Sequence, residues 1–174
     1  MKSVVKVLIS KKKIAKRVNE LGKSISSYYK NINNNILFIG ILKGAFIFIA
    51  DLCRAVTISH EIDFIIISSY GNKKNSSNSK IKIIKDLDID VKNKNILIVE
   101  DIIDSGKTLN FLINILLLRN PKSIATCSLL NKPFKRVVDV NIEWIGFNIP
   151  NDFVVGYGID YAQKYRFLPF IGKI

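Results

Sequence analysis

The sequence predicts an α/β fold in which a mainly parallel, twisted sheet is flanked by helices. Short apolar runs alternate with longer segments of helical spacing, and several of the short runs are apolar at every residue. A strand of that kind is buried on both faces, as in a parallel sheet covered by helices on both sides. The chain has 174 residues, 48% of them hydrophobic, so one domain over residues 1–174 is expected.

The expected helices and strands alternate along the chain. Residues 11–30 place apolar side chains at helical spacing between lysines, which predicts an amphipathic helix capped by Ser10. A polar break at 31–35 precedes a buried strand, and residues 70–80, rich in Gly, Asn, Ser and Lys, predict a loop. The other expected elements are strands over 36–40, 62–67, 81–84, 123–130, 143–147 and 153–155, a strand ending at Val99, and helices over 44–56 and from Ser105 to about Arg119, before Pro121.

Composition bounds the compartment and the partners. With 27 Lys+Arg against 14 Asp+Glu the formal charge is +13, which suits either nucleic acid or small phosphorylated substrates. Cys53 and Cys127 lie far apart in apolar surroundings and predict reduced core thiols, not a disulfide or a zinc site. Residues 1–10 do not resemble a signal peptide, and the apolar stretch 36–50 is short for a membrane span. A cytoplasmic protein with no membrane segment is expected.

Residues 96–109 are the most informative segment. A buried strand, Ile96 to Val99, runs into Glu100 and Asp101, which could hold Mg²⁺ or sugar hydroxyls. Ser105-Gly106-Lys107-Thr108 then opens a helix, whose unpaired N–H groups bind phosphate well. Asp104 lies between the two, where it could act as a general acid or base.

The end of this segment also imitates a nucleotide-binding P-loop. In that motif a glycine stands five residues before the Gly-Lys-Thr end, and that position is Asp101 here. An acid at this position would repel phosphate, so the P-loop interpretation is rejected.

The segment resembles the phosphoribosyl-diphosphate signature of the type I phosphoribosyltransferases, and it looks most like their hypoxanthine phosphoribosyltransferase branch. The resemblance extends over nearly the whole chain. It implies the fold of that family, with a small hood, a flexible flap loop, Mg²⁺ as cofactor, and a dimer or tetramer. It also implies a role in purine salvage, with transfer of the 5-phosphoribosyl group from phosphoribosyl diphosphate to N9 of hypoxanthine, and of guanine, and release of diphosphate.

The resemblance also assigns roles to individual residues of the segment 96–109. Glu100 and Asp101 would bind ribose hydroxyls or metal, and Asp104 would manage the proton of the purine N7 region. The Ser105, Gly106, Lys107 and Thr108 amides would hold the 5-phosphate.

Four other segments complete the implied site. Lys43 and Gly44 would bind the diphosphate, in a loop with a strained peptide bond before the basic residue. Ser69 and Tyr70 would belong to the flap, which closes over the reacting atoms. Lys132 would donate to the exocyclic oxygen of the purine. In the last segment, Phe153 would stack on the base, the backbone of Val154 would face its edge, Asp160 would contact a second Mg²⁺, and Arg166 would approach the diphosphate.

Two alternatives remain open on the sequence. One is a phosphoribosyltransferase that prefers guanine, xanthine or a pyrimidine. The other is an RNA-binding regulator built on the same fold and similar to the pyrimidine attenuation regulators, which the positive charge permits. The flap and base-pocket residues favour the enzyme, so nucleic acid is not the expected main partner. His60 receives no role.

Overall fold

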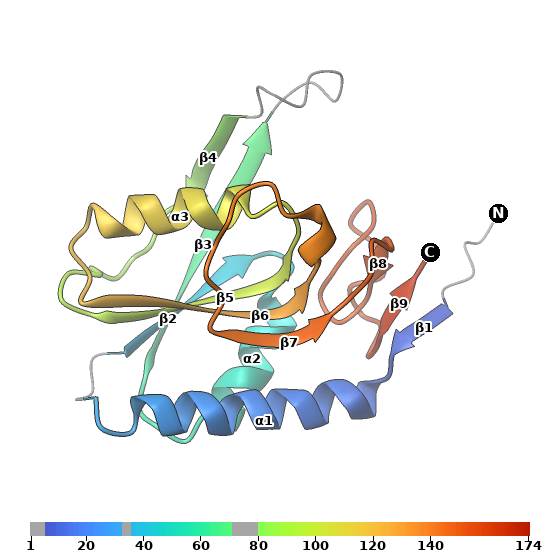
Figure 1. The fold of residues 1–174 in the computed structure, drawn as a ribbon, viewed down its shortest axis with the longest axis horizontal. Helices are drawn as coiled ribbons and strands as arrows, with labels where there is room; N and C mark the ends of the chain where they lie inside the picture. Colours follow the sequence, from blue (N-terminus) through green and yellow to red (C-terminus); the bar gives the residue numbers. More distant parts are fainter. Residues whose placement is uncertain (1–5, 33–35, 71–79) are drawn as a thin grey trace.

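The protein is described here by a computed structural model that covers residues 6–32, 36–70 and 80–174, with the backbone alone at 69, 70 and 80. Its helices and strands alternate along the chain, as the sequence predicts (Figure 1). Their bounds are β1 Lys6–Ile9, α1 Lys11–Tyr29, β2 Ile36–Leu42, α2 Phe46–Ala55, β3 Glu61–Tyr70, β4 Lys80–Lys85, β5 Asn95–Ile103, α3 Lys107–Leu117, β6 Ser123–Asn131, the 3₁₀ turn η1 Pro133–Lys135, β7 Trp144–Asn148, β8 Val154–Val155 and β9 Ile171–Lys173.

The larger sheet confirms the predicted parallel architecture. Within the described residues it has the strand order β4-β3-β2-β5-β6-β7, with parallel pairing everywhere except between β3 and β4. Helices α1 and α2 cover one face of the sheet and α3 covers the other (Figure 1). The carboxyl ends of the parallel strands therefore meet at one edge, where α/β proteins bind ligands.

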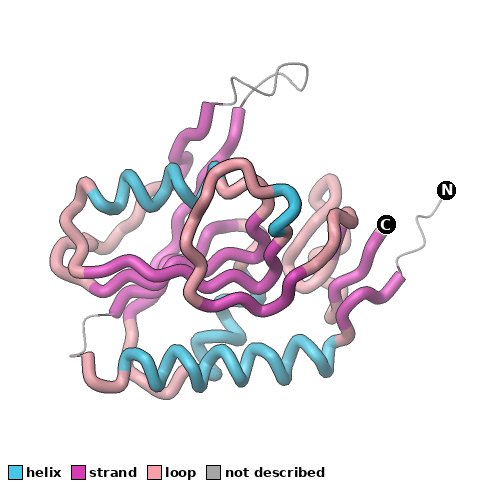
Figure 2. Tube along the Cα trace, in the orientation of Figure 1, coloured by secondary structure: helices cyan, strands magenta, loops and turns pink. Residues whose placement is uncertain are grey.

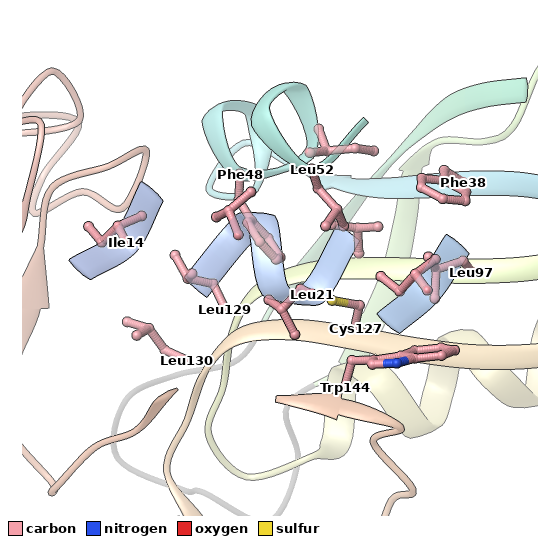
Figure 3. Close-up of a cluster of buried hydrophobic side chains, with 14 of the residues drawn as sticks. Ile14, Leu21, Phe38, Phe48, Leu52, Leu97, Cys127, Leu129, Leu130 and Trp144 are labelled. Atoms are coloured by element: carbon pink, nitrogen blue, oxygen red, sulfur yellow. The ribbon is translucent and has the colours of Figure 1, made fainter. Parts of the chain in front are cut away.

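Side chains of the central strands are buried on both faces. In β2, Phe38 packs into the core beneath α1 and α2, whereas Leu37 and Ile39 pack into the core beneath α3. The continuous apolar runs of the sequence follow from this two-sided burial. Figure 3 shows the first core, in which helix and strand side chains meet, among them Leu21, Phe48, Cys127 and Trp144.

A separate, smaller sheet forms the hood. It pairs β1, β9 and β8 in antiparallel register, so the start of the described chain lies beside its end. Strands this short carry little sequence pattern, and β1 and β9 were not predicted. Figure 2 shows the long loop before β9 beside this hood.

Several predicted boundaries are wrong. β5 does not end at Val99 but continues to Ile103, because its backbone stays paired with β6 through Ile103 and Asn131. α2 begins at Phe46, since residues 43–45 form a turn. β3 continues to Tyr70 by pairing with Lys80 of β4, so the polar loop is shorter than predicted, and its residues 71–79 lie outside the described part.

Two negative expectations concern the membrane and the cysteines. In the described part of the chain, every helix is too short or too polar to cross a bilayer. Cys53 and Cys127 are both free thiols; Cys127 is buried in the core and Cys53 packs against it.

The contact between α1 and α2 generates a stability prediction. Gly-to-Ala changes within helices usually stabilise by about 1 kcal/mol, but a Cβ at Gly22 would lie 2.6 Å from both Cβ and the carbonyl oxygen of Ala55. We expect Gly22→Ala to destabilise the protein by about 1–3 kcal/mol, measured by urea unfolding. Ser27→Ala, on the exposed face of α1, is the matched control and should change little. A more stable Gly22→Ala protein would contradict the close helix contact.

Candidate functional site

The loops that follow β2, β5 and β6 lie next to one another. The three strands are parallel neighbours, with Gly40 opposite Val99 and Ile103 opposite Asn131. The amide of Lys132 donates to the carbonyl of Ile103 over 3.0 Å, which ties two of these loops together. The sheet therefore brings four segments singled out by the sequence, around residues 43, 101, 105 and 132, to one edge.

The loop after β2 makes very close backbone contacts. The peptide bond between Leu42 and Lys43 is cis, at the place where the resemblance implies an unusual bond. A Cβ at Gly44 would lie 1.9 Å from Oδ2 of Asp101, and one at Gly158 would lie 2.3 Å from the Gly44 carbonyl oxygen. Only glycine can stand at position 44, because the Asp101 carboxyl occupies the space of a side chain.

Glu100 and Asp101 of β5 form an interacting acid pair in which Asp101 is buried and Glu100 is half-buried, with its Oε2 atom out of solvent. Burial, the neighbouring Asp101 charge and a hydrogen bond to Asp101 raise the pKa of Glu100 well above its usual range. Burial also raises the pKa of Asp101, against the opposing effect of backbone amides and of the positive charge of Arg166. Oε2 of Glu100 has no hydrogen-bond partner among the described atoms. Two carboxyls held in this way favour a shared proton, a cation or ligand hydroxyls between them.

The loop that begins α3 has the features of an anion site. Gly106 adopts a left-handed conformation, with φ 82°, as the residue before the first turn. The sequence predicted that the helix would begin at Ser105, but it begins at Lys107. A cavity of about 140 Å³ lies in front of this loop and is lined by Glu100, Asp104, Ser105, Gly106 and Thr108, among others. Lys107 is not among the residues that line this cavity and instead lines a neighbouring hollow with Asn110 and Phe111.

Asp104 lies between two lysines. Its carboxylate oxygens are 3.4 Å from Nζ of Lys132 and 3.8 Å from Nζ of Lys135. Lys132 is only 5% exposed, which is rare for a lysine and excludes an ordinary surface role. Lys135 was not singled out from the sequence; its position one turn beyond Lys132 in a basic segment was the available signal.

The hood contributes the aromatic and basic residues. Phe153 is 53% exposed and contacts the ring of Tyr161 edge-on, so it is free to stack on a flat ligand, while Val154 is buried in β8. The predicted strand over 153–155 begins only at Val154. Asp160 pairs with Arg166 at 2.8 Å, and Arg166 also donates to the Gly158 carbonyl over 2.7 Å.

The predicted metal ligands do not form a complete cage. In the residues that the structure covers, no three His, Cys, Asp or Glu side chains lie close enough together to hold a metal ion. Glu100 and Asp101 are adjacent, whereas Asp160 is engaged by Arg166. The donor set still fits Mg²⁺, because this ion is usually held by one or two carboxylates together with water and substrate oxygens.

The predicted flap residues lie at the far end of β3. The backbones of Ser69 and Tyr70 pair with Ile81 and Lys80 of β4. Their side chains and the loop between the two strands lie outside the described residues, so their role stays a prediction.

Fold and site together define a phosphoribosyltransferase domain, and the family model described as "Phosphoribosyl transferase domain" matches residues 6–162. Hypoxanthine phosphoribosyltransferase of Buchnera aphidicola (subsp. Schizaphis graminum) is 59% identical over the whole chain and 98% of its own length. The enzyme of the same name from Escherichia coli K12 is 54% identical over the whole chain and 97% of its length. A solved hypoxanthine-guanine phosphoribosyltransferase from Bacillus anthracis superposes with a TM-score of 0.91 at 45% identity, covering 98% of this chain and 99% of that one. The chain belongs to the hypoxanthine phosphoribosyltransferase family.

The buried acid pair generates a prediction about stability. Because the folded protein holds a proton on Glu100 above its ordinary pKa of 4.5, folding becomes less favourable as pH rises from that value towards the raised pKa. Glu100→Gln removes this penalty, so without divalent metal we expect its Tm at neutral pH to exceed that of the wild type by about 2–4 °C. Thermal unfolding in a chelating buffer at pH 4.5 and 7.5 measures the difference, which should grow with pH.

Glu20→Gln is the matched control, because Glu20 is exposed and pairs only with Arg17 among the contacts described for it. Its Tm should stay close to that of the wild type at both pH values. A Glu100→Gln protein that melts below the wild type at neutral pH would mean that the ionised carboxylate is stabilised by its surroundings.

Proposed function

We propose that the protein acts in purine salvage and transfers the 5-phosphoribosyl group of phosphoribosyl diphosphate to N9 of hypoxanthine, and also of guanine. The products are the purine nucleoside monophosphate and diphosphate. One observation carries the proposal: Asp104 and buried Lys132 form an ion pair directly beside the loop that begins α3. The site thus places three groups side by side: the Asp104 carboxylate, which can take a proton, the Lys132 ammonium, which can donate to a carbonyl oxygen, and an anion site.

The 5-phosphate of the substrate binds at the amides of residues 105–108. At the start of a helix such N–H groups lack an intrahelical carbonyl partner, and the dipole of α3 favours an anion there. The Lys107 amide makes one long contact, to Oγ of Ser105 at 3.4 Å. Binding at this distance from the reacting carbon holds the sugar in place and contributes to catalysis through orientation.

The base binds between Phe153 and the end of β6. The exposed ring of Phe153 stacks on the purine, and the backbone of Val154 meets its edge. Lys132 donates to the exocyclic oxygen at carbon 6, which favours hypoxanthine and guanine over adenine, whose amino group is itself a donor. Burial of Lys132 supports this role, because a base without an acceptor at carbon 6 would leave the ammonium with Asp104 as its ion-pair partner and its remaining N–H donors unpaired.

The diphosphate leaves from the loop after β2. Lys43 and the amide of Gly44 bind it, and Arg166, which approaches Asp101 from the hood, adds positive charge. Glu100 and Asp101 would hold either Mg²⁺ or the ribose hydroxyls, and the ion would neutralise charge on the leaving diphosphate. Asp160 holds Arg166 in place and accepts from the Gln163 amide, so contact with a second Mg²⁺ would require the ion to share these carboxylate oxygens.

Asp104 handles the proton of the base. As the bond between N9 and the sugar forms, positive charge develops on the purine, and a carboxylate near N7 can hydrogen-bond to that region and accept its proton. Lys132 and Lys135 hold the Asp104 carboxylate in position. Ser69 and Tyr70 close over the centre and exclude water from the reactive sugar cation. The protein works in the cytoplasm as a homodimer or homotetramer.

Replacement of Asp104 tests the proton role. Asp104→Asn keeps the size of the side chain but removes the base, so kcat should fall by roughly 10²-fold or more while the fold is retained. Steady-state kinetics with hypoxanthine measures the loss, and circular dichroism checks the fold. Asp90→Asn, at an exposed site, is the control and should keep full activity. Near-normal turnover of Asp104→Asn would remove Asp104 from this role.

The substrate assignment is tested by diphosphate release with phosphoribosyl diphosphate and Mg²⁺. Hypoxanthine, guanine, xanthine and uracil are offered separately. We expect rapid release with hypoxanthine, measurable release with guanine, and little with xanthine or uracil. If no base supports turnover, the proposed activity is wrong.

A further inference from the structure

Arg136 packs against the back of the anion-binding loop. The amides of Val137 and Val138 both donate to the Ser105 carbonyl over 3.0 Å. A Cβ at Gly106 would lie 2.5 Å from the Val138 carbonyl oxygen and 3.2 Å from Cδ and Nη1 of Arg136. In Figure 1 the segment after η1, in orange, passes close to the start of α3. Residues 136–138 therefore pack directly against the backbone of Gly106.

The guanidinium of Arg136 is anchored at one end. Its Nη2 donates to Oδ1 of Asn131, the last residue of β6. Asn131 in turn donates to Oδ1 of Asn148, the last residue of β7, over 2.8 Å. Arg136 is thus connected to the carboxyl ends of two strands of the sheet, which hold the guanidinium plane in one orientation.

In the part of the chain that the structure describes, the other end of the guanidinium makes no hydrogen bond. Nη1 of Arg136 is buried without a hydrogen bond among the described atoms. Burial lowers the pKa of Arg136, against the attraction of Asp139 and Asp104. A buried charged donor without an acceptor costs free energy, so its retention at this place requires an explanation. Oδ1 of Asp104, across the same turn and near Lys132 and Lys135, also lacks a hydrogen bond.

We propose that Arg136 is a positioning residue for phosphoribosyl transfer, which holds the 104–106 turn in the shape that binds the 5-phosphate. It acts through the Gly106 backbone, against which it packs, and it places a positive charge behind the anion site. This role requires the planar guanidinium of arginine, because Nη2 bonds to Asn131 while Nη1 faces the 104–106 turn. This inference rests on the proposed function, in which residues 105–108 bind the 5-phosphate.

The test compares a ligand that has the 5-phosphate with one that lacks it. Isothermal titration measures the dissociation constants of inosine 5′-monophosphate and of inosine for the wild type, Arg136→Gln and Arg136→Lys. We expect Arg136→Gln to weaken monophosphate binding by about tenfold, the loss of roughly one charge-assisted interaction, while inosine binding stays the same. Arg136→Lys should show an intermediate loss, because lysine keeps the charge and loses the fork. A general loss of structure would weaken both ligands alike.

Arg119→Gln is the matched control. Arg119 also makes a paired guanidinium contact, with both oxygens of Asp86 at 2.8 Å, but it lies beyond the other end of α3. The Arg119→Gln protein should prefer the monophosphate over inosine to the same degree as the wild type.

Each outcome has a distinct meaning. An unchanged preference for the monophosphate in Arg136→Gln overturns the inference; if that variant does not fold, an unchanged preference in Arg136→Lys overturns it. If the wild type itself binds inosine as tightly as the monophosphate, the 5-phosphate site of the proposed function fails instead. A selective loss in both Arg136 variants, absent from Arg119→Gln, supports the positioning role.

Discussion

The contact of three backbone segments around Gly44 is the constraint on which the site depends. The Asp101 carboxyl fills the space where a side chain at position 44 would lie, and Gly158 of the hood approaches the Gly44 carbonyl from the other side. Arg166 closes this arrangement by bonding to Gly158 and by attracting Asp101. The loop after β2, the acid pair of β5 and the hood therefore cannot move independently. A diphosphate and its cation would meet a surface that is already assembled.

Charged groups are concentrated at this edge of the sheet, and their arrangement destabilises the folded protein when no ligand is bound. The two carboxyls of Glu100 and Asp101 share a buried space, and burial raises the pKa of both. Within the described residues, buried side-chain atoms of Glu100, Asp104 and Arg136 make no hydrogen bond, although the Asp104 oxygen has an ion-pair partner in Lys132. Each lies where the proposed substrates would provide the missing metal, proton or phosphate. Holding these groups in place without ligand therefore lowers the stability of the folded protein, which is a common feature of active sites.

Much of the site could be predicted because its residues follow the ends of strands. Ile96 to Val99 is apolar at every position, so the strand and the two acids that follow this apolar run within β5 could be recognised from local pattern, and Gly106 marked the turn before α3. The lengths of the elements were less predictable. β5 and β3 continue into polar residues because neighbouring strands supply backbone partners, and that pairing is not written in the residues themselves. The hood strands β1 and β9 are too short for a sequence pattern, and they form by pairing with each other across the chain.

The sequence by itself determined the α/β class, the order of most elements and the identity of the segments that carry the chemistry. These features depend on local apolar periodicity and on residue types with few interpretations, such as paired acids before a small-residue turn. Only the tertiary structure decided that Lys132 is buried beside Asp104, that Lys107 lines a different hollow, and that Arg136 lies next to Gly106. Burial and contact between residues far apart in sequence depend on how the sheet and its helices pack. A lysine or arginine in a basic chain has the same local signature whether it faces solvent or a ligand.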